Sequence, residues 1–442
     1  MLSGLQQTNL DGAFFPLNDA LKEKDYTSNE LITAIDIAWN VYGKDNGLLV
    51  VAQKQDRVLL NKGGVSIAAS VASGKNIPGY YPYQTVEYAD GVKGDEGGVS
   101  VLRNGKGKDL TTLIYKYTSH GLSHGHFDKL NINLYDQGNE ILTDYGSVRF
   151  VGIEQKYGGR YLPENKTYAS QTIAHNTLVL DETSHFNGKE SDAEKYHSEK
   201  LFSDISDPNV QVVAAGERNA YKNTDLQRTI YMLQLPGAKK IIVDVFNAIS
   251  TGKVQFDLPF QYSGQLISTS FKYDYSEKRQ EPFGKNNGYQ FLWKEGEASV
   301  KDTIAQFTFL NNRTYYTISS LIEGTASLFF TRTGANDPNF NLRREPAFII
   351  RKNGSVQSFI SVIEIHGKFD PVIEFSTNSY SSVQNMKLLE NGDNSIIEII
   401  ISGKKLLIAQ SNKDFNKTQK HSTKEINWTG PFTVLYDGKI LK

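Results

Sequence analysis

The feature that most constrains the fold is a long succession of strand-like runs from about residue 83 to the C-terminus. Runs rich in Val, Ile, Thr, Tyr and Phe follow one another at short intervals, with Gly, Asn and Asp between them. Turn patterns at Asn104-Gly105, Lys352-Asn353-Gly354 and Asn391-Gly392-Asp393 predict antiparallel pairing of neighbouring runs. There are too many runs for one small sandwich. The sequence therefore predicts a mainly β fold, with a large antiparallel β-sandwich followed by a C-terminal β-sheet.

The first 78 residues show a different, helical pattern. Ser28 is a suitable residue to cap a helix whose apolar positions recur at helical spacing over 31–38. Further helices are expected within 48–60 and 65–72, and these segments are too few to form a helical domain by themselves. We therefore expect three units, a helical part over 1–78, a β-sandwich over 79–340 and a C-terminal β-sheet region over 341–442.

Charge and cysteine content exclude several classes of protein. The 442 residues include 48 basic and 49 acidic side chains, so the net charge of −1 gives no indication of a nucleic-acid partner or of an anionic membrane surface. Cysteine is absent, which excludes a disulfide framework. No run of 18 apolar residues is present, so no transmembrane helix is expected.

Histidine is concentrated in one stretch, residues 116–188. Within it, residues 130–136 alternate apolar and polar side chains, Gln137-Gly138-Asn139 reads as a hairpin turn, and residues 140–146 read as the returning strand. Five of the eight histidines lie in this stretch, namely His120, His124, His126, His175 and His185.

The hairpin predicts a meeting of possible metal ligands. His126 lies just before the outgoing strand and Asp144 at the end of the returning one, and a hairpin brings its outer ends together. His175 opens a third apolar run that can lie beside them. Two imidazoles and a carboxylate form a set that Zn²⁺ accepts. From spacing alone, the alternative is that both histidines are buried and satisfied by backbone carbonyls, with Asp144 a turn residue.

Four ordered motifs carry a resemblance to a known family. SHGHFDKL (123–130), DYGSVRF (144–150), GGRYLPEN (158–165) and IAHNTLVLDE (173–182) resemble the heparinase II/III-like domain of polysaccharide lyases. The similarity is greatest to the oligoalginate lyases of polysaccharide lyase family 17. It is densest over 116–188 and extends more thinly to the stretch SVIEIHGKFDPVIE at 361–374.

The resemblance implies an alginate or oligoalginate lyase that acts by β-elimination, from chain ends, on 1,4-linked uronates. Such a reaction needs a neutralised carboxylate, a base for the C5 proton and an acid for the departing oxygen. By resemblance, Tyr161 and His124 are catalytic and Arg149 binds the substrate. The corresponding alternatives are a loop tyrosine on the sheet rim, a solvent-facing histidine and an arginine in a surface salt bridge.

The resemblance also implies that the zinc is structural, held by His126, Asp144 and His175, because elimination consumes no water. Two rival functions remain open. One is a lyase for heparin, heparan sulfate or another uronate polysaccharide, although a neutral chain favours alginate over sulfated polymers. The other is a carbohydrate-binding module without catalytic activity.

In the resembled family, a helical toroid supplies an Asn-His pair and a second tyrosine to the cleft. Here the first histidine is His120, and the helical part is short. We therefore expect the chain to be the C-terminal portion of a longer lyase, to eliminate slowly alone and to expose an apolar helical face. The first 15 residues lack a signal-peptide pattern, but by resemblance we expect a periplasmic or secreted protein.

Overall fold

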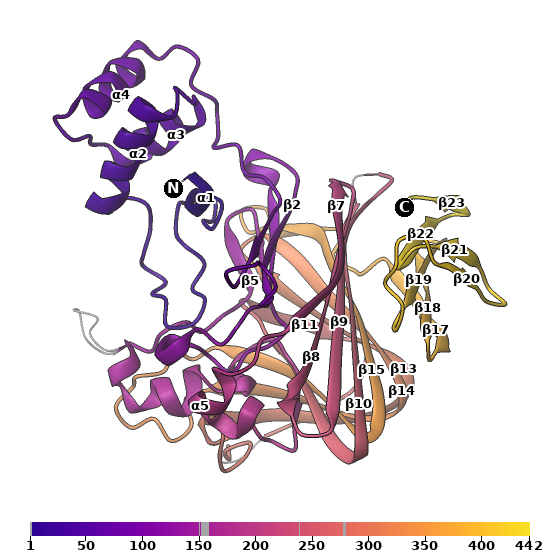
Figure 1. The fold of residues 1–442 in the computed structure, drawn as a ribbon. Helices are drawn as coiled ribbons and strands as arrows, with labels where there is room; N and C mark the ends of the chain where they lie inside the picture. Colours follow the sequence, from indigo (N-terminus) through magenta and orange to yellow (C-terminus); the bar gives the residue numbers. More distant parts are fainter. Residues whose placement is uncertain (1, 150, 152–158, 238, 277–279) are drawn as a thin grey trace.

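The computed structural model describes residues 2–149, 151, 159–237, 239–276 and 280–442. It is mainly β, as predicted, with helices gathered near the N-terminus (Figure 1). The α-helices of the described residues are α1 Leu2–Leu5, α2 Asn29–Val41, α3 Gly47–Gln55, α4 Lys62–Ser73 and α5 Glu190–Ala193. Short 3₁₀ or π segments are η1 Gly107–Asp109, η2 Leu122–His124, η3 Gly159–Tyr161, η4 Asn165–Ala169, η5 Thr172–Ala174, η6 His185–Gly188 and η7 Tyr289–Phe291.

The helix starts follow the sequence. The Ser28 hydroxyl accepts a hydrogen bond from the Leu31 N–H (3.4 Å), which confirms the predicted start of α2. Asn61 caps α4 in the same way, through the Gly64 N–H (2.8 Å). The helix expected within 48–60 is shorter than predicted, because Asp56 adopts a left-handed conformation and ends α3.

Two β-sheets form the sandwich. The smaller is antiparallel and has the strand order β1-β2-β3-β4-β5, and the larger has eleven strands. The predicted hairpin at 130–146 is confirmed as β4 and β5. The small sheet contains β1 Val86–Ala89, β2 Gly98–Asn104, β3 Thr111–Tyr117, β4 Asn131–Asp136 and β5 Asn139–Leu142. The large sheet contains β6 Val179–Leu180, β7 Glu199–Asp207, β8 Val210–Tyr221, β9 Thr224–Leu235, β10 Lys239–Gln261, β11 Gln265–Thr269, β12 Asp274–Tyr275, β13 Leu292–Asn311, β14 Thr314–Thr333, β15 Pro346–Asp370 and β16 Phe375–Thr377.

The large sheet corrects one turn prediction. Lys352-Asn353-Gly354 does not end a strand, because β15 continues through it as a single strand of 25 residues. Pairing with β10 holds the backbone extended there, since Phe256, Gln255 and Val254 of β10 lie opposite these three residues. The irregularity appears as register shifts in the neighbouring strands, between Ile249 and Val254 of β10 and between Leu321 and Ser327 of β14. Runs that read as separate strands in the sequence are therefore halves of long, bulged strands.

A third sheet packs against the outer face of the large one. It has the order β17-β18-β19-β22-β23, beside the small β20-β21 pair. Its strands begin at Val383. The expected boundary at 340 would assign β15 to the C-terminal sheet, but strand pairing places β15 in the large sheet. These strands are β17 Val383–Asn391, β18 Asn394–Ile401, β19 Lys404–Ser411, β20 Lys420–Ser422, β21 Asn427–Thr429, β22 Phe432–Tyr436 and β23 Lys439–Ile440.

The large sheet is the middle layer and is apolar on both faces. In β10, the side chain of Ile242 packs into the core shared with β2, β3 and β4. Its neighbours Ile241 and Val243 point the other way, into the core shared with β18 and β19. Period-2 alternation therefore builds two cores from one strand, and the buried metal-ligand candidates lie beside the first of them.

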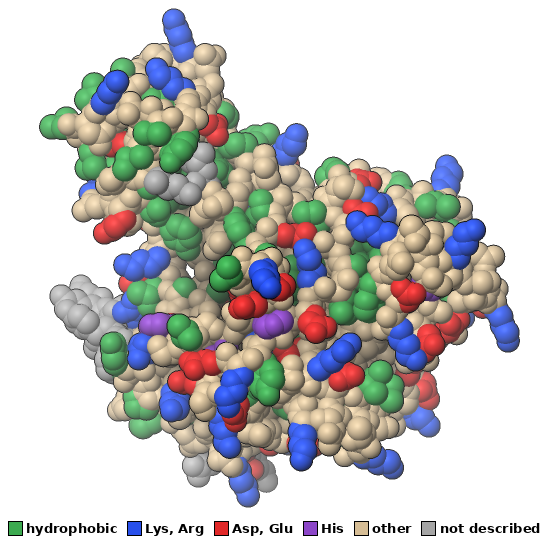
Figure 2. Space-filling view, in the orientation of Figure 1, with side chains coloured by type: hydrophobic (Ala, Val, Ile, Leu, Met, Phe, Trp, Pro, Cys, Tyr) green, Lys and Arg blue, Asp and Glu red, His purple; other side chains and the backbone are tan. Residues whose placement is uncertain are grey.

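Helices α2, α3 and α4, here called the helical lobe (29–73), have a small core of their own around Trp39 and Ile67. The lobe stands apart from the sheets (Figure 1), and Figure 2 shows hydrophobic side chains exposed on it. The expected exposure of an apolar helical surface is confirmed by Val41 (61% exposed), Leu60 (97%) and Val65 (56%). None of the helices in the described part of the chain is long and apolar enough to cross a bilayer.

Candidate metal centre and active site

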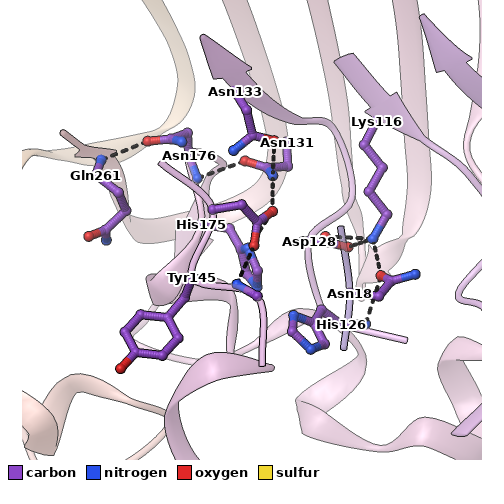
Figure 3. A network of polar contacts seen from close by, with 12 residues as sticks. Asn18, Lys116, His126, Asp128, Asn131, Asn133, Tyr145, His175, Asn176 and Gln261 are labelled. Atoms are coloured by element: carbon purple, nitrogen blue, oxygen red, sulfur yellow. Dashed lines mark hydrogen bonds and ion pairs between the residues drawn. The ribbon is translucent and has the colours of Figure 1, made fainter. Parts of the chain in front are cut away.

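The predicted metal-ligand candidates meet at the open end of the β4–β5 hairpin. His126 precedes β4, Asp144 follows β5, and His175 follows η5. One ligand atom from each lies within 4.8 Å of the others, and the two imidazole ring centres are 5.3 Å apart. All three side chains are buried, so the core around the hairpin determines their positions (Figure 3).

The hydrogen bonding of these side chains fits a metal ion. His126 Nδ1 and both ring nitrogens of His175 are buried without a hydrogen-bond partner among the described residues. His175 Nδ1 lies 3.5 Å from Asp144 Oδ2. Buried polar atoms are rarely left unpaired, because an unpaired one costs about 1–3 kcal/mol. A cation between two imidazoles and a carboxylate would satisfy them, so this buried His-Asp-His group could hold a metal ion.

Polar neighbours hold the carboxylate of Asp144 in place. Asn131 Nδ2 donates to Oδ2 (3.1 Å) and the Gly146 N–H donates to Oδ1 (3.1 Å). The nearby Asp128 carboxylate accepts two hydrogen bonds from Lys116 Nζ, both 2.6 Å (Figure 3). Asp128 therefore belongs to a buried ion pair, whereas the Asp144 carboxylate faces His175.

The pKa values of the two buried histidines are shifted in opposite directions. Burial lowers the pKa of His126, since the charged imidazolium loses hydration. Burial acts in the same direction on His175, but the adjacent Asp144 carboxylate outweighs it and raises the pKa. Burial would raise the pKa of Asp144, whereas His175 lowers it, with the net result below the ordinary value. Asp144 is thus ionised at neutral pH, as a metal-binding carboxylate must be.

Two predicted catalytic residues lie at the surface, next to this buried group. The His124 side chain is 59% exposed and Tyr161 is 84% exposed. Arg160 lies between them, with its Nη1 3.1 Å from His124 Nε2 and its guanidinium carbon 5.6 Å from the centre of the Tyr161 ring. A guanidinium can only donate, so His124 Nε2 must be an unprotonated acceptor in this arrangement. The site thus presents a neutral imidazole and a phenol beside a fixed positive charge.

Asp19 is a site residue that the sequence analysis missed. Its Oδ2 is 3.1 Å from His124 Nδ1, and its Oδ1 is 3.2 Å from His126 Nε2. Burial would raise the pKa of Asp19, but these histidines and Asn165 lower it. Nothing in the run FFPLNDALKEKD marks this aspartate, because its role depends on a contact with residues more than 100 positions away.

The predicted substrate-binding arginine is paired in this structure. Arg149 Nη2 is 3.1 Å from Glu23 Oε1, and the Arg149 side chain is 19% exposed. Glu23 belongs to the segment that carries Asp19, so this ion pair joins Arg149 to that segment. Its expected role in binding a uronate carboxylate stays a prediction.

One glycine explains how His124 and His126 diverge. A side chain on Gly125 would place its Cβ 2.0 Å from the His120 carbonyl oxygen and 2.7 Å from the His120 ring. This close approach lets the chain turn between an exposed His124 and a buried His126. Two further polar side chains near this turn, Asn165 and Gln171, are buried and form internal hydrogen bonds.

Comparison with known proteins places the geometry in context. A family model described as "Heparinase II/III-like, C-terminal" matches residues 88–429. The chain is 40% identical over 434 residues to an exo-oligoalginate lyase of Saccharophagus degradans, covering 96% of this chain and 58% of that protein. It is 35% identical over 421 residues to an alginate lyase of Stenotrophomonas maltophilia, covering 95% of this chain and 56% of that protein. The chain thus spans somewhat more than half the length of these relatives.

Solved structures support the fold. A heparinase III structure superposes with a TM-score of 0.59 at 14% identity, covering 92% of this chain and 50% of that chain. A heparan sulfate lyase from Pedobacter heparinus gives a TM-score of 0.58 at 15% identity, covering 94% and 53%. At these identities the likeness concerns the arrangement of the strands and not the substrate.

Proposed function

Because the chain belongs to the heparinase II/III-like, C-terminal family, we propose that it is the β-rich portion of an alginate or oligoalginate lyase. The reaction is β-elimination at 1,4-linked uronates, acting from chain ends and releasing an unsaturated uronate. The observation that carries the proposal is the cluster of His124, Arg160 and Tyr161, a neutral imidazole and a phenol beside a guanidinium, in a chain 40% identical to an exo-oligoalginate lyase.

Elimination requires two proton transfers, one from the substrate carbon and one to the departing oxygen. A base removes the proton from C5, the C4–C5 double bond forms, the C4–O bond breaks, and an acid protonates the departing oxygen. We assign these two proton transfers to Tyr161 and His124. The exposure of both side chains allows a sugar chain to approach them, and the Arg160 guanidinium carbon lies 5.6 Å from the centre of the Tyr161 ring.

Negative charge develops on the uronate carboxylate when the C5 proton leaves. Arg160 belongs to the cluster, and Arg149 pairs with Glu23 in the segment that carries Asp19. A guanidinium binds a carboxylate with two parallel hydrogen bonds, and such preorganised charge is worth several kcal/mol when it meets charge in the transition state. In this proposal Arg149 exchanges its contact with Glu23 for the substrate carboxylate.

We assign Zn²⁺ to the group formed by His126, Asp144 and His175. When bound, the ion would cross-link the end of the β4–β5 hairpin to the segment before β6. The residues of the chain carry the chemistry, and the cross-link stiffens the backbone that leads to His124. By resemblance, we also propose a periplasmic or secreted location, which subcellular fractionation of the native host would test.

The substrate class is tested with a panel of oligomannuronate, oligoguluronate and heparan sulfate oligosaccharides. Each elimination creates a double bond conjugated to the carboxylate, which is followed by its ultraviolet absorbance. We expect the alginate oligomers to give the faster rise, with monomeric unsaturated uronate as the first product. A faster rise with heparan oligosaccharides would overturn the substrate assignment. Binding of alginate oligomers without any rise would favour a carbohydrate-binding module.

A further inference from the structure

The segment that carries Asp19 lies outside the region matched by the family model, yet it is fixed firmly to the site. Phe15 packs against Val101 and Ile114 on the outer face of the small sheet. Beyond it, the Ser147 N–H donates to the Ala20 carbonyl (3.1 Å), and the Ser147 hydroxyl donates to the Asp19 carbonyl (2.9 Å). The backbone of Asp19 is therefore held at the turn that follows Asp144.

The Asp19 side chain connects the buried group to the exposed one. Its two oxygens approach different histidines, His126 inside and His124 outside. Asn165 Nδ2 donates to Oδ1 at 2.8 Å and fixes the rotation of the carboxylate. The Asp19 side chain is 11% exposed, so water competes little for these contacts.

An ionised carboxylate can only accept, so it selects one tautomer of each histidine. His126 must carry its proton on Nε2, which leaves Nδ1, the buried nitrogen without a partner, with its lone pair free for a metal ion. His124 must carry its proton on Nδ1, which leaves Nε2 facing Arg160 and the exposed side. Both outcomes are those that the proposed metal and catalytic roles require.

We propose that Asp19 is a positioning residue that sets the tautomer and orientation of both the metal-ligand candidate His126 and the catalytic candidate His124. The inference rests on the proposed function of this site. One carboxylate thereby couples the metal centre to the surface where proton transfer takes place. Carboxylates that orient metal-binding histidines in this way typically change metal affinity or activity about 10–100-fold when they are replaced.

An aspartate suits this position better than its amide. In Asp19→Asn, only one atom can accept, and the amide N–H₂ would face a histidine nitrogen that carries a proton in the native arrangement. At least one of the two histidines must then change tautomer or move. Asp25→Asn is the matched control, because Asp25 lies in the same segment, loses the same charge and accepts hydrogen bonds from the N–H and the hydroxyl of Thr27.

The test begins with the unmodified, zinc-loaded protein. Long-range ¹H–¹⁵N correlation spectra of the imidazoles are expected to show His124 protonated on Nδ1, and His126 protonated on Nε2 with Nδ1 bound to metal. The opposite tautomer at either histidine would overturn the proposal, and this measurement does not depend on any variant folding.

The variants then give the second readout. Zinc affinity, measured by competition with a chelator, is expected to fall about 10–100-fold in Asp19→Asn and less than about 2-fold in Asp25→Asn. With an alginate oligomer, kcat should fall about tenfold or more in Asp19→Asn, with KM changing less than about 3-fold, since Asp19 does not touch the sugar. Equal zinc affinities and unchanged imidazole spectra in the two variants would show that Asp19 only anchors its segment. Because the zinc and imidazole readouts use no substrate, a failure of the lyase assignment leaves them interpretable.

Discussion

The site has two halves that differ in how they are held. His126, Asp144 and His175 are at most 1% exposed and are positioned by the sandwich core. His124 and Tyr161 are largely exposed and are positioned by a few polar contacts at the surface. The core thus fixes the positions of the proposed metal ligands, while the proposed catalytic groups beside them depend on neighbours such as Arg160 and Asp19. Changes in the buried half should therefore act on stability and metal content, and changes in the exposed half on turnover.

The largest effect is expected from His175→Ala. The variant removes a proposed buried ligand, and loss of the ion would leave the buried Asp144 carboxylate without a positive partner, which together should cost about 3–5 kcal/mol of unfolding free energy. Elemental analysis should show loss of zinc, and chemical denaturation the loss of stability. His197→Ala is the control, because the His197 ring hydrogen-bonds to the carbonyl of the adjacent Ser198 and lies outside the proposed metal-ligand set. Unchanged zinc content in His175→Ala would remove this residue from the metal centre.

Tyr161→Phe tests the exposed half. The substitution deletes only the hydroxyl, and loss of a proton-transfer group should reduce turnover about 100-fold, equal to about 2.7 kcal/mol of barrier. Since Tyr161 is 84% exposed, the free energy of unfolding should change by less than about 0.5 kcal/mol. Initial rates on alginate oligomers and a denaturation curve check the two parts. Near-normal turnover would refute the catalytic role.

The buried residue His120 should make the stability of the protein depend on pH. Burial lowers the pKa of His120 to about 4, although Asp128 acts in the opposite direction. A histidine with a depressed folded-state pKa supports stability above its unfolded pKa of about 6.5, and this contribution is lost as the pH falls toward 4. His120→Leu should therefore weaken the loss of stability between pH 6.5 and 4 by about 2–3 kcal/mol. Parallel stability–pH curves for the variant and the unmodified protein would contradict this.

The smallest effect is expected from Arg149→Lys. An ammonium cannot form the two parallel hydrogen bonds of a guanidinium, so KM for alginate oligomers should rise about tenfold, or about 1.4 kcal/mol. The contact with Glu23 is partly exposed, and surface pairs of this kind contribute only about 0–1 kcal/mol to stability. An unchanged KM would indicate that the Arg149–Glu23 pair is structural only.

Local patterns in the sequence predicted much of the fold and less of its connectivity. The Ser28 cap, the 130–146 hairpin and the mainly β class follow from side-chain periodicity and turn chemistry, and they are found in the structure. The continuity of β15 does not follow, because Lys352-Asn353-Gly354 reads locally as a turn. Pairing with β10 overrides that local preference, and such pairing is invisible in one sequence.

The site divides in the same manner. The meeting of His126 and Asp144 could be predicted, because a hairpin joins its own ends. The contacts of Asp19 with His124 and His126 could not, because they join segments 105 and 107 residues apart through a loop without a periodic pattern. The pairing of Arg149 with Glu23 escaped prediction for the same reason, with a separation of 126 residues.

The most direct test of the proposed metal centre and of the role of Asp19 is anomalous X-ray diffraction at the zinc absorption edge, from crystals of the zinc-loaded protein. We predict one strong peak enclosed by His126 Nδ1, His175 and the Asp144 carboxylate, with Asp19 hydrogen-bonded to His126 Nε2 and not bound to the ion. No peak at that position would contradict the assignment of the metal centre, and a peak coordinated by Asp19 in place of Asp144 would contradict the positioning role of Asp19.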